Sequence, residues 1–208
     1  MARNSRRGRD TRAEAQKIAC DLFNQKGYEA TSMREIAEQL GVTKAALYYH
    51  FTSKDEIVQS VLDERLEEVE TLLAWARAQP RTPHLLRDTV LRWLDSRSDN
   101  KLRGVRFAHA NQATLQAKFS PARSLGGRLR ELVEVVLGPG APPAARIRAH
   151  LAMGSINAVI AATAGLDVTD AELFASAREL ALSLTEPGLP IREPAPTSRG
   201  RRSGARPS

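Results

Sequence analysis

The sequence predicts an all-α protein of about nine helices, and two kinds of observation support this fold class. Apolar residues recur at intervals of three and four along most of the chain, while the alternation typical of a strand is nowhere sustained. Capping boxes, in which Ser or Thr precedes Glu by three residues, mark several helix starts. They are Thr11 with Glu14, Ser32 with Glu35, Ser53 with Glu56, and Thr169 with Glu172.

Three short helices are expected first, over residues 11–27, 32–41 and about 43–51. The first carries an apolar face with a period close to 3.6 residues, and Gly27 supplies its carboxyl-terminal stop. Gly41 ends the second in the same way, and Thr43 can cap the third.

Six further helices, most of them longer, are expected over residues 53–79, 83–94, 107–115, 120–137, 144–164 and 169–184. Proline and glycine separate them, most clearly in the loop "GPGAPP". Small residues dominate the segment 144–164, and such a surface lets another helix approach closely.

The change from short to longer helices near residue 52 suggests two domains. We expect a basic arm over 1–10, a three-helix domain over 11–52 and a larger helical domain over 53–186. Residues 187–208 are rich in Pro, Arg, Ser and Gly and have almost nothing to bury, which predicts a disordered basic tail.

The formal net charge is +7, and basic residues gather at both ends, with four arginines among the first ten residues. Such ends favour an anionic polymer as partner, and charge that serves only solubility is an equal alternative. No apolar run approaches the roughly 18 residues needed to span a bilayer, and no signal peptide is evident, so we expect a cytoplasmic protein. The single cysteine, Cys20, is interpreted as a small core residue rather than a reactive thiol.

The segment 33–52 carries the strongest local pattern, which is typical of a helix-turn-helix. Ala37 is small where two helices would cross, and Gly41 comes four residues later, where a tight turn requires positive φ. Val42 and Leu47 supply apolar anchors against the preceding helix.

The helix over 43–51 would present Lys44, Ala45, Tyr48 and Tyr49 on the side opposite Leu47. A major groove admits an α-helix, and these residue types suit its needs: Lys donates to guanine or phosphate, and Ala permits close approach. For Tyr48, a DNA contact and burial against Phe23 or Tyr28 remain open as equal alternatives.

Beyond that face, His50 lies at the end of the same helix, where its N–H can reach a phosphate. Lys54 begins the next helix, whose free backbone N–H groups form a natural phosphate site.

These residues resemble the DNA-binding domain of the TetR family of transcriptional regulators. The resemblance runs from about residue 11 to 57 and is carried by "FNQKGYEATSMREIAEQLGVTKAALYYHFTSKDEI". Ala45 departs from the family pattern, in which many members have Gly. By position, the resemblance implies these DNA contacts: Ser32, Arg34, Thr43, Lys44, Ala45, Tyr48, Tyr49, His50 and Lys54.

The resemblance also implies a repressor that binds a palindromic operator in double-stranded DNA as a homodimer and is released by a small-molecule effector. The dimer would form through about residues 144–184, and the effector would bind inside the larger domain. Candidate lining residues of this pocket are Trp93, Phe107, Leu115, Met153 and Asn157, although residues at such spacing are more often ordinary core. His109 and Asn111 are polar candidates that either recognise a ligand or cap a helix end.

Two other classes of protein are alternatives to this hypothesis. An architectural DNA-binding protein without an effector would use the basic ends to bind widely. An enzyme is disfavoured, because the sequence has no nucleophile elbow, no Cys–His pairing, no phosphate-cradling glycine loop and no metal-ligand spacing. Neither a metal nor a cofactor is expected.

Overall fold

The computed structural model describes residues 2–96, 101–111, 114–115, 118, 125–163 and 165–186, with side chains described from Asp10 onward except for Lys101. Ten helices have both ends among these residues. They are α1 (Ala2–Lys26), α2 (Met33–Leu40), α3 (Lys44–His50), α4 (Lys54–Ala78), α5 (Leu85–Asp95), α6 (Lys101–Ala110), α8 (Leu125–Leu137), α9 (Pro143–Met153), α10 (Ser155–Ala162) and α11 (Asp170–Thr185).

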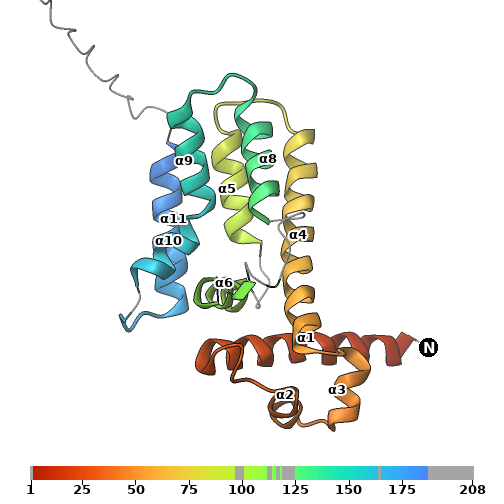
Figure 1. Ribbon diagram of the computed structural model, residues 1–208. Helices are drawn as coiled ribbons and strands as arrows, with labels where there is room; N and C mark the ends of the chain where they lie inside the picture. The colour runs from red at the N-terminus through yellow and green to blue at the C-terminus, as the bar shows by residue number, and fades with distance from the viewer. Residues whose placement is uncertain are drawn as a thin grey trace, which may run out of the picture.

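The helices form a bundle that stands on a smaller group of three (Figure 1). Helix α1 lies across the foot of the bundle, with α2 and α3 below it, and α4 rises from this group alongside α8. Helices α9, α10 and α11 pack together on the far side of α5, and α6 lies between the bundle and α1. The all-α prediction, with a helix-turn-helix followed by a larger helical domain, is confirmed.

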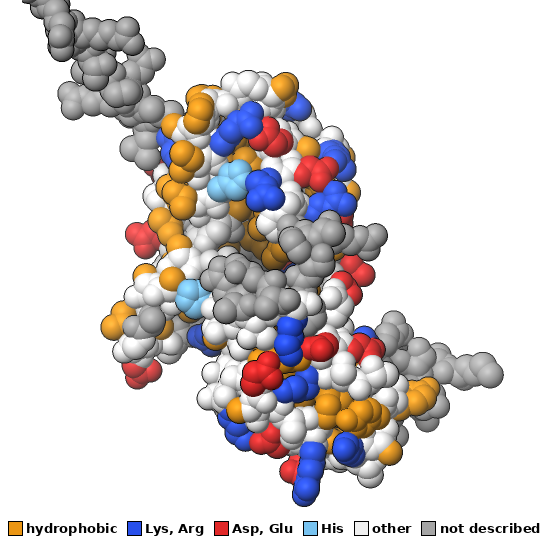
Figure 2. All heavy atoms as spheres, viewed as in Figure 1, with side chains coloured by type: hydrophobic (Ala, Val, Ile, Leu, Met, Phe, Trp, Pro, Cys, Tyr) orange, Lys and Arg blue, Asp and Glu red, His pale blue; other side chains and the backbone are white. Residues whose placement is uncertain are grey.

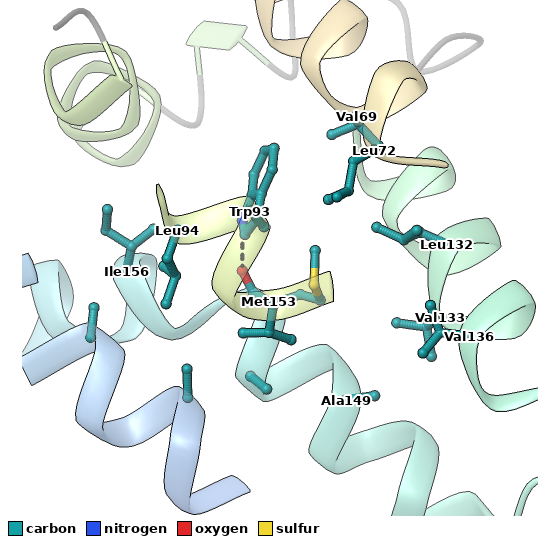
Figure 3. Packing of buried hydrophobic residues seen from close by; sticks show 14 of the residues in the cluster. Val69, Leu72, Trp93, Leu94, Leu132, Val133, Val136, Ala149, Met153 and Ile156 are labelled. Carbon is teal, nitrogen blue, oxygen red and sulfur yellow. Dashed lines mark hydrogen bonds between the residues drawn. The ribbon is translucent and has the colours of Figure 1, made fainter. Parts of the chain in front are cut away.

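Two hydrophobic cores hold these parts together. The larger core joins α4, α5, α8, α9, α10 and α11 around buried residues such as Val69, Leu132 and Ile156 (Figure 3), and Leu102 of α6 also belongs to it. The smaller core fills the space among α1, α2, α3 and the start of α4, and Phe107 of α6 enters it. The Phe107 ring lies 5.2 Å from the Phe23 ring, so α6 packs on the three N-terminal helices as well as on the bundle.

Helix α1 is longer than predicted. It begins at Ala2, so Thr11 lies inside the helix and does not cap it. Arginine is a good helix former, which explains why the arginine-rich start of the chain continues the helix. The expected basic arm over residues 1–10 therefore lies within α1 from Ala2 onward, whereas the tail expected over 187–208 falls outside the described residues.

Two helix boundaries in the bundle also differ from the prediction. Helix α6 covers 101–110 rather than 107–115. The single helix expected over 144–164 is two helices, because the chain turns at Gly154, with φ −90° and ψ 7°. A Cβ at that position would meet the carbonyl oxygen of His150 at 3.2 Å, so glycine permits this close approach of the backbone.

The interpretation of Cys20 as a core residue agrees with its burial at 3% exposure. Burial, and then the neighbouring charge of Asp21, raises the pKa of its thiol to about 12. The thiolate that would be the reactive form is therefore disfavoured. Every helix among the described residues is too short or too polar to cross a bilayer.

Candidate nucleic-acid interface

The turn between α2 and α3 is fixed by local hydrogen bonds that its sequence encodes. At the start of α2 the Ser32 hydroxyl accepts from the Glu35 N–H, and the Glu35 carboxylate accepts from the Ser32 N–H at 2.8 Å, which completes the predicted capping box. At its end Gly41 adopts the left-handed conformation with φ 71°, and the Val42 N–H donates to the Ala37 carbonyl at 3.0 Å. A residue with a Cβ would be strained here, so Gly41 sets the angle at which α3 leaves α2.

Helix α3 is seven residues long and has one buried face. The Thr43 hydroxyl caps its start by accepting from the Ala46 N–H at 3.1 Å. Leu47 and Phe51 are fully buried in the smaller core, and Val42 packs against that core. This orientation leaves Lys44, Ala45, Tyr48 and Tyr49 on the exposed side of the helix.

The two tyrosines of α3 lie in solvent, Tyr49 at 87% exposure and Tyr48 at 41%. Tyr48 is therefore not a core residue, which excludes its burial against Phe23 or Tyr28, and its contact with DNA stays a prediction. The Lys44 ammonium lies 5.5 Å from the Tyr48 ring centroid, and the Tyr49 ring meets the His50 ring edge-on at 5.3 Å. Figure 2 shows hydrophobic side chains gathered over the α3 end of the molecule with Lys and Arg side chains beside them.

The other predicted contact residues surround this face. Ser32, Arg34 and Thr43 are exposed, and Arg34 forms an ion pair with Glu38 one turn along α2 at 2.7 Å. His50 is half-buried at the end of α3. Lys54 is half-buried too, and its ammonium donates to the Tyr28 carbonyl at 2.7 Å. Lys54 therefore fixes the turn between α1 and α2 as well as adding charge at the start of α4.

Tyr28 joins elements that are distant in the sequence, and the sequence analysis did not identify this role. Its hydroxyl donates to the Asp55 carboxylate at the start of α4, and its backbone N–H donates to the Asn111 side-chain oxygen at 3.3 Å. Burial, and then the hydrogen bond with Asp55, raises the pKa of the phenol well above its ordinary value. The ammonium groups of Lys54 and Lys118 lie 4.5 and 4.6 Å from its ring centroid.

Helix α6 is also tied to α1 by polar contacts. Arg103 forms an ion pair with Asp21 at 2.8 Å, and its carbonyl accepts from the Asn24 side chain at 3.4 Å. The paired residues lie 82 and 79 positions apart in the sequence. No pattern among neighbouring residues could therefore predict these contacts. The three N-terminal helices are thus connected to the bundle through both α4 and α6.

The seven candidate pocket residues do not gather at one site, which corrects that part of the sequence analysis. Trp93 and Met153 belong to the larger core, where the Trp93 indole N–H donates to the Met153 carbonyl at 3.2 Å (Figure 3). Phe107 is buried in the smaller core and Leu115 packs against it. Helical spacing identified these apolar residues as inward-facing, but it could not tell which core they enter.

The three polar candidates have other surroundings. The Asn111 side chain accepts a hydrogen bond from the Tyr28 N–H and donates one to the Phe107 carbonyl at 3.0 Å. His109 and Asn157 are exposed on α6 and α10. Their side chains point away from the cores, so neither can line an internal cavity within one chain.

A groove of about 770 Å³ lies between α4 and α5, and Trp93 is the one predicted pocket residue that lines it. Its apolar lining comes from Leu72, Leu91 and Trp93, and its rim carries five carboxylates. These are Glu64, Glu67, Glu68, Asp88 and Asp95. Burial, and then the neighbouring charge of Glu68, raises the pKa of Glu64. Among the described residues, no group of His, Cys, Asp or Glu is arranged to hold a metal ion.

The helix-turn-helix geometry agrees with a comparison to known families. Residues 17–61 match the family described as "Bacterial regulatory proteins, tetR family". The N-terminal domain of this chain belongs to the tetR family of bacterial regulatory proteins. The matched segment contains α2, α3 and the start of α4, and the exposed face of α3 is therefore part of a DNA-binding helix-turn-helix.

Individual relatives share this TetR-family domain. The chain is 44% identical over 52 residues to the A-factor receptor protein of Streptomyces griseus, covering 25% of this chain and 19% of that protein. It is 39% identical over 76 residues to the HTH-type transcriptional regulator TtgR of Pseudomonas putida, covering 36% of each. The chain therefore matches less than two thirds of the length of either relative.

Solved structures resemble the whole TetR-like fold. A transcriptional regulator from Aquifex aeolicus VF5 matches with a TM-score of 0.56 and 20% identity, covering 85% of this chain and 99% of that one. A γ-butyrolactone receptor, described as ArpA-like, matches with a TM-score of 0.55 and 20% identity, covering 86% and 98%. At this identity the likeness shows the fold of the larger domain and leaves its ligand open.

Phe107 is buried and Asn157 is exposed, so replacing each side chain by alanine should affect stability differently. Phe107→Ala should lower the free energy of unfolding by about 3–5 kcal/mol, because it opens a cavity between α6 and the N-terminal helices. Asn157→Ala should leave it nearly unchanged, since that side chain is exposed. Urea unfolding followed by circular dichroism measures both, and equal stability of the two variants would contradict the placement of Phe107.

Proposed function

We propose that the chain is a transcriptional repressor that binds a palindromic operator as a homodimer and releases it when a small molecule binds the larger domain. The observation that carries this proposal is the exposed face of α3, where a lysine and two tyrosines stand in solvent above a fully buried opposite face. Such a surface suits a major groove, which admits an α-helix and supplies both base edges and phosphates.

The residues around α3 divide into two roles. Lys44, Ala45 and Tyr49 face the base edges, where Lys donates to guanine and Ala touches a thymine methyl. The remaining residues bind phosphates through their hydroxyl, imidazole, guanidinium and ammonium groups. They are Ser32, Arg34, Thr43, Tyr48, His50 and Lys54.

The exposed side of α9 supports a homodimer through about residues 144–184. Ile147 is 60% exposed and Leu151 is 51% exposed, and both line a shallow depression together with His150. Figure 2 shows hydrophobic side chains in a row on the side of the molecule formed by α9 and its neighbours. A second copy packed on this side would bury them. To enter successive major grooves, the two α3 helices of the dimer would have to lie about 34–36 Å apart, one turn of DNA.

The two connections between the N-terminal helices and the bundle support control by an effector. Lys54 of α4 and Asn111, the residue that follows α6, both bond to Tyr28, so a ligand that shifts either helix would move the domain that carries α3. The ligand acts through its different affinity for the DNA-bound and released forms. The name of the A-factor receptor protein agrees with such a role for a relative. A regulator of this kind acts on DNA in the cytoplasm.

Substitutions on the exposed face should weaken DNA binding without unfolding the protein. Lys44→Ala and Tyr49→Ala should each cost about 1–3 kcal/mol in affinity for DNA that the wild-type protein selects from a random pool. Fluorescence anisotropy measures the affinity, and circular dichroism checks that the unfolding midpoint is unchanged.

Lys17→Ala on α1 is the control, because it removes an equal charge outside the helix-turn-helix. If both α3 variants bind DNA with wild-type affinity, Lys44 and Tyr49 are not DNA contacts.

A charge in the proposed dimer interface should separate the subunits. Leu151→Asp buries a carboxylate at the contact, which is unfavourable without a partner, and should convert dimers to monomers in analytical ultracentrifugation. Ala78→Asp, at the exposed end of α4, is the matched control and should stay dimeric. If Leu151→Asp remains a dimer, the interface between the subunits does not include this side of α9.

A further inference from the structure

Arg12 of α1 contacts the carboxyl end of α3 in two ways. One guanidinium nitrogen, Nη1, donates to the carbonyl oxygen of His50 at 2.7 Å. The guanidinium carbon Cζ also lies 4.2 Å from the centroid of the Phe51 ring. The same side chain therefore engages the last residue of α3 and the buried residue that follows it.

These contacts stabilise the carboxyl end of α3. A helix of seven residues is too short to be stable by itself, and the last carbonyls of any helix have no partner inside it. A cation at this end also interacts favourably with the helix dipole. The planar guanidinium can stack on a ring while it donates in its own plane, which a lysine ammonium cannot do.

The helix that carries Arg12 is itself held firmly. One turn further along α1, the Gln16 side chain is buried at 9% exposure and donates to the Ser60 hydroxyl of α4 at 2.9 Å. The Thr52 N–H and hydroxyl donate to the Glu56 carboxylate, which fixes the residues between α3 and α4. Arg12 thus connects α3 to a helix that is itself bonded to α4.

We infer that Arg12 is a positioning residue, which holds α3 at the angle at which its exposed face matches the base edges, without contacting a base. This inference rests on the proposed function, since it assigns a part in DNA discrimination. Its consequence is specific: loss of Arg12 reduces affinity for the selected sequence, whereas affinity for unrelated DNA is retained. A phosphate contact by Arg12 is the competing role, and it would weaken binding to every sequence alike.

The experiment compares wild-type protein, Arg12→Met and Arg12→Lys on two duplexes, one selected from a random pool and one of scrambled sequence, over a series of salt concentrations. Both variants should bind the selected duplex about tenfold more weakly, as when one base contact is lost. Both should bind the scrambled duplex like the wild type and keep the wild-type slope of log Kd against log salt concentration. Arg77→Met, which removes an exposed arginine at the far end of α4, is the matched control and should change neither affinity.

Two outcomes on DNA overturn the inference. If Arg12→Met lowers the salt slope by about one and Arg12→Lys restores it, Arg12 contacts a phosphate. If both variants discriminate between the duplexes as the wild type does, Arg12 has no part in positioning.

A second readout does not depend on DNA. In the free protein, hydrogen exchange at the backbone amides of Tyr49, His50 and Phe51 should be faster in Arg12→Met than in the wild type, with exchange in α9 unchanged. Unchanged protection at these amides overturns the inference. If the wild-type protein selects no DNA, the proposed function fails, and hydrogen exchange still decides whether Arg12 holds α3.

Discussion

The burial of Leu47 and Phe51 in the smaller core is the interaction on which the rest of the interface depends. Helix α3 is too short to persist alone, so it depends on the burial of these two side chains, to which the contact of Arg12 with its carboxyl end is added. Because successive residues lie about 100° apart, burying this face directs Lys44 and Tyr49 outward. The exposed aromatic surface is therefore a consequence of the core beneath it.

The same core links the interface to the bundle. Ile57 at the start of α4 and Phe107 of α6 are both buried in it, so the boundary expected between residues 52 and 53 crosses a continuous set of contacts. Tyr28 strengthens this link by bonding to Lys54 and Asn111. The three N-terminal helices thus share a core with two bundle helices, which is the arrangement that the proposed control by an effector requires, since packed interiors respond as a unit.

The sequence predicted the features that depend on neighbouring residues. The capping box at Ser32, the turn at Gly41 and the outward face of α3 follow from signals within a few residues, and the structure confirms them. The predicted pocket was wrong in its grouping because it depends on how distant helices meet, and helical spacing carries no information about that. The contact of Arg103 with Asp21 and the entry of Phe107 into the smaller core belong to this second kind.

The central claim is that α3 presents a sequence-reading surface and that two copies act together. Selection of bound sequences from a pool of random double-stranded DNA tests it most directly, because it requires no knowledge of the operator. The account predicts an inverted repeat whose half-sites are centred about one helical turn apart, 10–10.5 base pairs. A pool that yields no common sequence, or a single motif without a symmetric partner, would contradict it.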